Sequence, residues 1–335
     1  MLPYFPRTYP DELLYSVLAR YHCHTCSRSA AQTLGDLFGD HYVRATLDLP
    51  GHLGALSARL PPDRELTAER LAKDFTLFPY WTAFQPAGVS ALSLASLING
   101  SASRAHTCLG IVPSGVRLSR PLRFCPTCNA EAVARWGECF WRRAHQLPGV
   151  LVCPVHGTPL AEYAGLLELG CKHEFFAATA ETCPADTPPP PWADDEECLP
   201  LLQEIARRSA ALLTTRPNAE TFETLTARYR RGLPELGLAT TSRHIDHRHL
   251  HDAFAAAFKP VSTISASDGR NQMAGQNRSQ APPRLPSSSP HSYPNISGAP
   301  SAYSSIRTFR PGALVLHQSL GRPLRAGCRH GPIDL

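Results

Sequence analysis

Cys125-Pro-Thr-Cys128 and, after 24 further residues, Cys153-Pro-Val-His156 form the stretch that decides how this chain folds. In each of these two turns, two residues separate the first and last side chains, and one of the two is a proline that stiffens the backbone. Structural zinc sites hold the ion with four Cys or His ligands in tetrahedral geometry. The pattern therefore predicts one Zn²⁺ ion bound by Cys125, Cys128, Cys153 and His156.

The segment between the two turns predicts further structure. Its 24 residues exceed the gap of about 15–20 residues that is common in zinc ribbons, so we expect an inserted helix there. His145 is an alternative fourth ligand, but only His156 repeats the spacing of the first turn.

Other uses of such cysteines fit the sequence less well. A redox Cys-x-x-Cys motif does not require the second turn. Covalent haem attachment needs a histidine where Asn129 stands. A zinc deaminase needs a His-x-Glu motif, which the chain lacks. Because a catalytic zinc ion keeps one coordination position open, four protein ligands indicate a structural site and a protein that is not an enzyme.

Composition places the chain among proteins of the cytoplasm. Its 335 residues allow two or three domains. It has no run of 18 apolar residues, and the first residues lack the apolar stretch of a signal peptide, so we expect no membrane association and reduced cysteines. The whole chain has a formal net charge of +5. Residues 260–335 carry eight Arg, no Lys and two Asp, a net charge of +6, so residues 1–259 have a net charge of −1. Nucleic-acid binding must therefore depend on local patches.

Residues 1–110 predict an N-terminal helical region. Apolar residues at helical spacing indicate two short helices within residues 11–43, with Asp11 as the first N-cap and Gly39 near the second end. This order is typical of a helix-turn-helix, although two packed helices of any α-helical domain look the same. Cys23, His24 and Cys26 lie between the two helices and are weak evidence for a metal site.

Two more helices are expected in the remainder of that region. One starts near Pro62-Asp63 and runs into the aromatic cluster Leu77-Phe-Pro-Tyr-Trp81, which we expect in the core, with base stacking as the alternative. The other spans about residues 88–98.

Residues 111–186 form the predicted zinc-ribbon region, which is also rich in arginine. Residues 117–150 contain six Arg against two Glu, with Trp and Phe between them, a composition suited to phosphate contacts. The alternative is a solvated helix face. The predicted DNA-contacting or partner-contacting residues are Arg120, Arg123, Arg135, Arg142, Arg143, Arg230 and Arg231. A second metal site could use Cys171, His173 and Cys183.

The remaining chain divides into three parts. Residues 187–193 form a Pro-rich linker, and residues 194–259 form a helical module with three helices. Residues 260–335 are rich in Ser, Pro, Gly and Asn, and we expect them to be disordered. The fold class that follows is mainly α with small zinc-ribbon elements.

Several of these stretches resemble the TniQ/TnsD family. They are the opening Leu2-Pro-Tyr-Phe-Pro-Arg-Thr-Tyr-Pro-Asp-Glu-Leu-Leu-Tyr-Ser-Val-Leu-Ala-Arg-Tyr-His22, Leu37-Phe-Gly39, Leu77-Phe-Pro-Tyr80, Arg123-Phe-Cys-Pro-Thr-Cys128, Trp141 and His145-Gln-Leu-Pro-Gly-Val-Leu-Val-Cys-Pro-Val-His-Gly157. The resemblance covers residues 1–259 and implies a bacterial, nucleoid-associated protein that selects target sites for a transposon. It also implies that Cys125, Cys128, Cys153 and His156 bind zinc.

The resemblance further implies partners. Members of the family bind target DNA, or a DNA-binding complex with a guide RNA, and recruit an AAA+ ATPase regulator. The alternative function is a zinc-ribbon transcription regulator that binds promoter DNA, and a metal-dependent enzyme fits less well. Longer members continue with helical DNA-binding segments after the position of Phe258, whereas this chain turns to low-complexity sequence. We therefore hypothesise a frameshift in the gene soon after residue 260.

Overall fold

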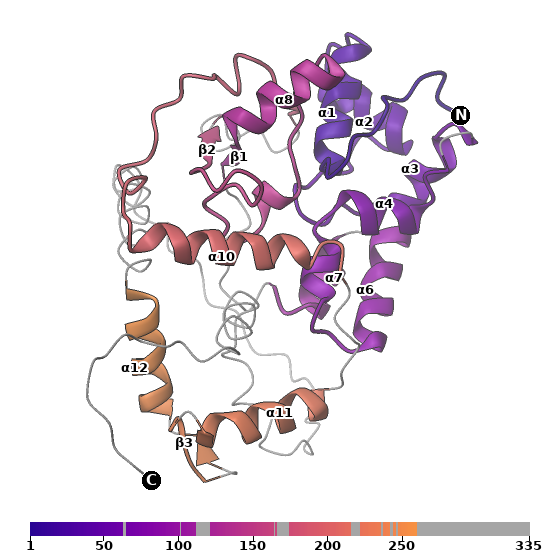
Figure 1. Cartoon of the computed structure of the whole chain (residues 1–335). Helices are drawn as coiled ribbons and strands as arrows, with labels where there is room; N and C mark the ends of the chain where they lie inside the picture. Colours follow the sequence, from indigo (N-terminus) through magenta and orange to yellow (C-terminus); the bar gives the residue numbers. More distant parts are fainter. Residues whose placement is uncertain are drawn as a thin grey trace, which may run out of the picture.

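The chain folds into a mainly helical structure with two small antiparallel sheets (Figure 1). The computed structural model describes residues 1–62, 65–100, 102–111, 121–163, 165, 174–215, 222–235, 237–241, 244–245 and 247–259. The predicted disordered tail at residues 260–335 lies outside this part. The predicted fold class, mainly α with zinc-ribbon elements, is confirmed.

The N-terminal region contains seven helices in its described residues. They are α1 (Leu14–His24), α2 (Ala30–Phe38), α3 (Leu53–Arg59), α4 (Ala68–Phe75), α5 (Phe78–Thr82), α6 (Ala87–Asn99) and α7 (Ala102–Cys108). Helix α2 begins after Ser29, whose hydroxyl accepts a hydrogen bond from the backbone N–H of Gln32, and it ends at Gly39 with φ of 76°. The predictions for the second helix and for a helix near residues 88–98 are thus confirmed.

Two predicted helix starts are wrong. Asp11 has φ of 61° and does not cap α1, which is preceded by Leu13. Its carboxylate instead accepts a hydrogen bond from the backbone N–H of Ala144 and lies 3.4 Å from Arg143. Helix α4 begins not near Pro62-Asp63 but after Thr67, whose hydroxyl accepts from the next turn of the helix. A proline next to an aspartate predicts a helix start at both places. At Asp11 a tertiary contact overrides this prediction, and at α4 the better N-cap residue Thr67 does so.

The metal segment combines a short helix with a two-stranded sheet. Its elements are β1 (Leu122–Phe124), α8 (Pro126–Trp136), the 3₁₀ helix η2 (Ala144–Gln146) and β2 (Ala161–Tyr163). Strand β1 pairs antiparallel with β2, with Arg123 opposite Glu162. Helix α8 is the helix that the long gap predicts. Because Cys125 follows β1 directly and the second turn lies shortly before β2, this pairing brings the two turns together.

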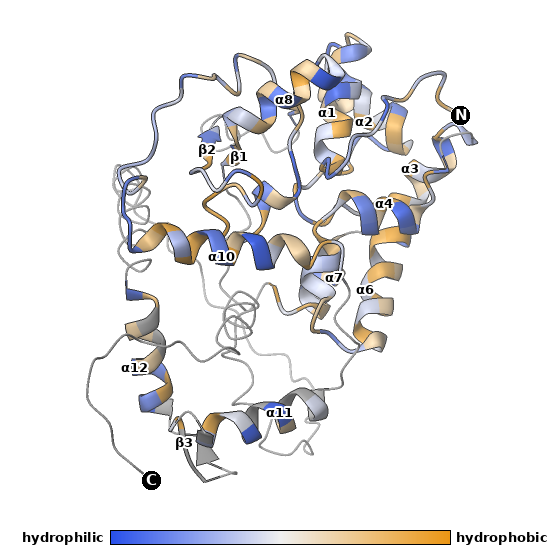
Figure 2. Ribbon diagram, in the orientation of Figure 1, coloured by the Kyte–Doolittle hydropathy of each residue, from blue (hydrophilic) through white to orange (hydrophobic). Residues whose placement is uncertain are grey.

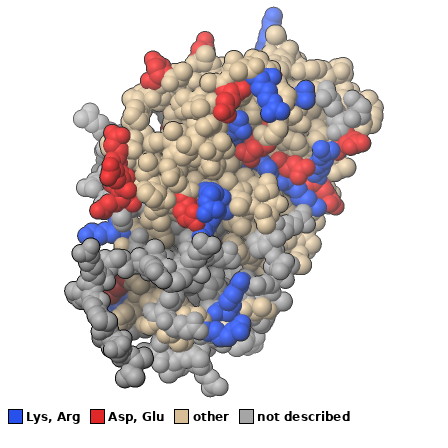
Figure 3. Space-filling view, viewed as in Figure 1, with Lys and Arg blue, Asp and Glu red and all other residues tan. Residues whose placement is uncertain are grey.

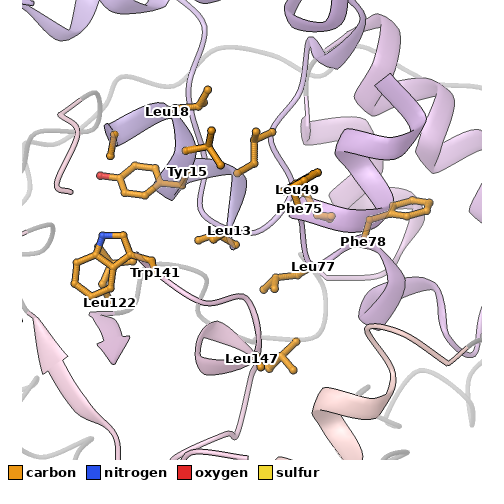
Figure 4. Close-up of a cluster of buried hydrophobic side chains, with 14 of the residues drawn as sticks. Leu13, Tyr15, Leu18, Leu49, Phe75, Leu77, Phe78, Leu122, Trp141 and Leu147 are labelled. Atoms are coloured by element: carbon orange, nitrogen blue, oxygen red, sulfur yellow. The ribbon is translucent and has the colours of Figure 1, made fainter. Parts of the chain in front are cut away.

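One hydrophobic core joins the N-terminal helices to the metal segment (Figure 4). Trp141 is fully buried in this core, and its backbone carbonyl accepts a hydrogen bond from the N–H of Leu13 at 2.9 Å. Its own N–H donates to the hydroxyl of Ser16, which is also buried. Tyr80 and Trp81 are buried as well, so the aromatic cluster belongs to the interior.

The C-terminal helices differ in how they pack. They are α10 (Cys198–Ala211), α11 (Phe222–Glu235) and α12 (His247–Ala257), with β3 (Ala239–Thr241) and β4 (His244–Ile245) between the last two. Helix α10 buries Leu202 and Ala206 in the common core, although the Pro-rich stretch precedes it. Its alternating polar and apolar bands are typical of a helix with one buried face (Figure 2). In Figure 1, α11 and α12 lie beyond α10, away from α1.

No helix in the described part of the chain has both the length and the apolar character needed to span a lipid bilayer.

Candidate metal centre

The two turns meet at one point and bring four ligand atoms together. The Sγ atoms of Cys125, Cys128 and Cys153 and a ring nitrogen of His156 all lie within 4.8 Å of one another. The three cysteines are buried, and His156 is partly exposed. In the described residues, no other group of three or more Cys, His, Asp or Glu side chains converges in this way.

The distances between these atoms fit tetrahedral coordination. Metal–sulfur bonds of about 2.3 Å and metal–nitrogen bonds of about 2.0–2.1 Å place tetrahedral ligands about 3.6–3.8 Å apart. The Sγ atoms of Cys128 and Cys153 are 3.6 Å apart, and Nδ1 of His156 lies 3.3 Å from Cys128 and 3.5 Å from Cys125. A disulfide would need about 2.05 Å between sulfurs. The arrangement therefore fits one metal ion and no disulfide.

The electrostatics of the sulfur atoms also favour a cation. Hydrogen bonds from Cys128 and Cys153 lower the pKa of the Cys125 thiol. The pKa of the Cys128 thiol is raised, because it keeps the proton of its hydrogen bonds with Cys125 and Cys153 and is buried. Three thiols this close to one another cannot all ionise to thiolates without a compensating positive charge. A bound divalent cation would supply that charge, and its binding would release protons.

Helix α8 supplies a carboxylate that orients the imidazole ligand. Nε2 of His156 lies 3.1 Å from the carboxylate of Glu131, while Nδ1 points to the sulfur atoms. A carboxylate on the far nitrogen of a ligating histidine fixes its tautomer and ring orientation. Sequence reasoning missed Glu131, although it stands three residues after Cys128 and so on the same face of α8.

His145 lies beside the four convergent side chains and is not one of them. Its Nε2 is 3.5 Å from Sγ of Cys153 and 3.9 Å from Sγ of Cys128, but it is not part of the convergent group. The ring is almost fully buried, and this burial lowers its pKa to about 3. A neutral ring with its proton on Nε2 would donate to the sulfur of Cys153. The preference for His156 as the fourth ligand thus agrees with the geometry.

Comparison with known proteins gives two matches. A family model described as TniQ matches residues 3–160, a range that contains α1 to α8 and all four ligands. The chain is also similar to the transposon Tn7 transposition protein TnsD of Escherichia coli, with 31% identity over 247 residues. That alignment covers 72% of this chain and 46% of the relative, so the chain spans about half the length of the relative.

Residues 3–160 belong to the TniQ family. We call them the TniQ segment. The TniQ segment contains both the N-terminal helices and the two metal-binding turns, and one hydrophobic core joins these parts. Cys171 and His173 of the predicted second metal site follow this segment and lie outside the described residues. The third, Cys183, is buried, and burial raises the pKa of its thiol to about 12.

Two of the predicted DNA-contacting arginines of the TniQ segment lie in its interior. Arg123 is 3% exposed and donates hydrogen bonds to the carbonyls of Leu147 and Val150. Arg143 is 6% exposed and donates to the carbonyls of Lys73 and Thr76. The expectation of DNA contacts is therefore wrong for these two residues, which instead satisfy buried carbonyl groups.

The other predicted arginines have different positions. Arg135 is exposed at the end of α8, and Arg142 is half-buried. On α11, Arg231 is exposed. Arg120 and the side chain of Arg230 lie outside the described part.

Proposed function

We propose that this protein selects target sites for a bacterial transposon, acting as a non-catalytic adaptor on DNA in the cytoplasm. The observation that carries the proposal is the similarity to TnsD over 247 residues. The TniQ match over residues 3–160, which contain the four convergent side chains, supports it. The adaptor would bind target DNA, directly or through a DNA-binding complex with a guide RNA. It would then recruit the AAA+ ATPase regulator of the transposon.

We propose Zn²⁺ as the ion of the metal centre. Three thiolates and one imidazole are a preferred donor set of zinc, and ligand distances near 3.5 Å suit its tetrahedral geometry. When bound, the ion would cross-link β1, α8 and the second turn. Four protein ligands leave no open position for a substrate or water, which supports a structural role.

The role of the metal centre would be to hold a docking scaffold. The N-terminal segment packs on residues 140–143, which lie between the two metal-binding turns. Fixing the turns would therefore also fix the orientation of α1 and α2, the helices that follow one another as in a helix-turn-helix. The orientation of these helices would set the surface that the ATPase or the DNA recognises.

A pull-down experiment tests the adaptor function. The full chain, purified with its metal, is immobilised and exposed to the AAA+ ATPase of the same transposon, with ATP and with duplex DNA of the insertion site. We expect retention of the ATPase that requires this chain. Binding of DNA without retention of the ATPase would favour a transcription regulator and overturn the adaptor proposal.

A further inference from the structure

A row of arginines and aromatic rings runs along the junction of the N-terminal segment and α8. Around Trp136, the guanidinium carbons of Arg135 and Arg7 lie 4.6 Å and 5.0 Å from the ring centroid. Tyr9 stacks between Trp136, at 5.2 Å, and Phe140, at 5.0 Å. Arg142 then lies 4.9 Å from the Phe140 ring centroid. We call Arg7, Tyr9, Arg135, Trp136, Phe140 and Arg142 the arginine–aromatic row.

Three guanidinium groups of this row are available to an anion. Arg7 and Arg135 are exposed, Arg142 is half-buried, and in the described residues none of them lies within ion-pair or hydrogen-bond distance of a carboxylate. The Nε atom of Arg142 is buried and has no hydrogen-bond partner among the described residues. Arg7 was not among the residues that sequence reasoning selected, because it lies 128 positions from Arg135.

The carboxylates around the row are occupied by other cations. Arg20 pairs with both Glu12 and Glu138, and Arg143 pairs with Asp11. One turn earlier on α8, Glu131 contacts the imidazole of His156. Among the described residues, the positive charge of Arg7 and Arg135 is therefore not neutralised by a carboxylate, while that of Arg142 is partly offset by Asp11. In Figure 3, blue and red atoms are interspersed over the face shown, so this excess is a local one.

The geometry favours phosphate contacts over base stacking. Guanidinium groups already lie over the Trp136 ring, so this ring holds the arginines in place by cation–π attraction. Arginines fixed in this way lose little freedom when they bind, and their planar donor groups match phosphate oxygens. An arginine that is only solvated at the surface does not need a half-buried aromatic ring beneath its guanidinium group.

We propose that the arginine–aromatic row contacts the phosphate backbone of duplex DNA. This inference depends on the proposed function, because it assigns the backbone contacts of the target DNA to named residues. Backbone contacts fix the position of a protein on the duplex and carry little sequence information. The row would therefore add affinity at any DNA sequence, while other residues select the site.

The test is a salt titration of DNA binding by the full, metal-loaded chain. Fluorescence anisotropy follows a labelled duplex of random sequence, and in a second series a single strand of equal length. The test variant replaces Arg7, Arg135 and Arg142 together by Gln. The control variant is Arg104→Gln, which removes an exposed arginine on α7 that lies over no aromatic ring of the described residues.

We expect the triple variant to bind the duplex roughly tenfold or more weakly, and to lower the slope of log affinity against log salt by about three, one for each lost phosphate contact. Arg104→Gln should behave as the wild type. Metal content and melting temperature establish that the triple variant is folded. If it does not fold, Arg7→Gln with Arg135→Gln alone, both at exposed positions, should lower the slope by about two.

Three results would overturn the inference. An unchanged duplex affinity and salt slope in a folded variant would remove the row from the DNA interface and leave the adaptor proposal standing. Tighter binding of the single strand, lost on Trp136→Ala, would show base stacking in place of phosphate contact. If the wild-type chain itself bound no duplex DNA, the inference and the DNA-binding part of the proposed function would both fail.

Discussion

The chain contains two turns with the same Cys-x-x-Cys spacing, and the structure treats them in opposite ways. Cys125 and Cys128 are buried and converge with two further ligands from a second turn. Cys23 and Cys26, at the end of α1, are both exposed, and no third ligand converges on them among the described residues. Equal spacing thus leads to a group of four convergent ligand atoms in one place and to an exposed turn in the other.

The difference lies in what surrounds each pair. The sheet of β1 and β2 brings a second turn to Cys125 and Cys128. The predicted third ligand beside Cys23 and Cys26 is His24, and both of its ring nitrogens already have partners. Nδ1 lies 2.7 Å from the hydroxyl of Tyr4, and Nε2 lies 3.1 Å from the carboxylate of Glu138. A pair of cysteines becomes a site only when the fold delivers further ligands that are not otherwise engaged.

The largest effect should come from breaking the first turn. Cys125→Ser removes one of four ligands, and the apparent binding energy of structural zinc in small peptides is on the order of 10–16 kcal/mol. We expect loss of stoichiometric metal and unfolding of the region around β1 and α8. Elemental analysis and circular dichroism measure both. Full metal content in Cys125→Ser would show that Cys125 is not a ligand.

A smaller effect should follow from removing the side chain next to the ligands. His145→Phe keeps a ring in the buried position but removes the ring nitrogen Nε2, which lies 3.5 Å from Sγ of Cys153. Loss of such a supporting hydrogen bond typically weakens metal affinity by about 10–100-fold. Competition with a chelator measures the affinity. If the variant loses all metal, as Cys125→Ser should, then His145 is itself a ligand.

The contact that occupies His24 can be weakened separately. Burial by itself would raise the pKa of Glu138, but hydrogen bonds from Arg20 and Tyr9 outweigh burial and hold the pKa below its usual value of 4.5. Glu138→Gln should lower the free energy of unfolding by about 1–2 kcal/mol, because it removes charge-assisted hydrogen bonds. Urea unfolding of the metal-saturated proteins measures this difference.

The pH dependence of that difference has a definite sign. A carboxyl group whose folded pKa is depressed stabilises the folded state above its unfolded pKa, and this contribution is lost as pH falls through the folded pKa. The difference between wild type and Glu138→Gln should therefore be present at about pH 5 and above and shrink as pH falls below about 4.5. A difference that grows as pH falls below about 4.5 would contradict the assignment of the ion pair with Arg20.

The smallest effect should come from the second Cys-x-x-Cys turn. Replacing Cys23 and Cys26 together by Ser should change the free energy of unfolding by no more than about 0.5 kcal/mol, as for most exposed substitutions. Metal content should stay the same, since neither sulfur belongs to the convergent group. A loss of metal in this variant would erase the contrast between the two turns.

Much of the fold and of the metal centre follows from local sequence signals. The capped helix that ends at Gly39 and the helix between the two turns rest on short spacings whose physical cause is local. The repeated spacing of the two turns indicated the four convergent side chains, although the pairing of β1 with β2 is what brings them together. The role of Glu131 could also have been found, because a residue three positions after Cys128 on a helix faces the same side.

Other features depend on long-range contacts that no local pattern contains. Asp11 looks like a helix cap but pairs with Arg143, which is 132 positions away. From its sequence context Arg123 is expected at the surface, but in the structure it is buried and donates to the carbonyls of residues 147 and 150. Composition counts charged residues but does not say which of them the fold turns inward. For this reason the prediction from sequence placed too many arginines on the surface and did not include Arg7.

The backbone contacts between residues 11–13 and 141–143 have a consequence for how this protein can be divided. The N–H of Leu13 bonds to the carbonyl of Trp141, and the N–H of Arg143 bonds to the carbonyl of Asp11. A fragment that stops before residue 141 would leave α1 without the strip of chain on which it rests. During synthesis, the first helices can complete their packing only after residues 141–143 have emerged from the ribosome. Recombination that separates the two stretches would leave both halves without these backbone hydrogen bonds.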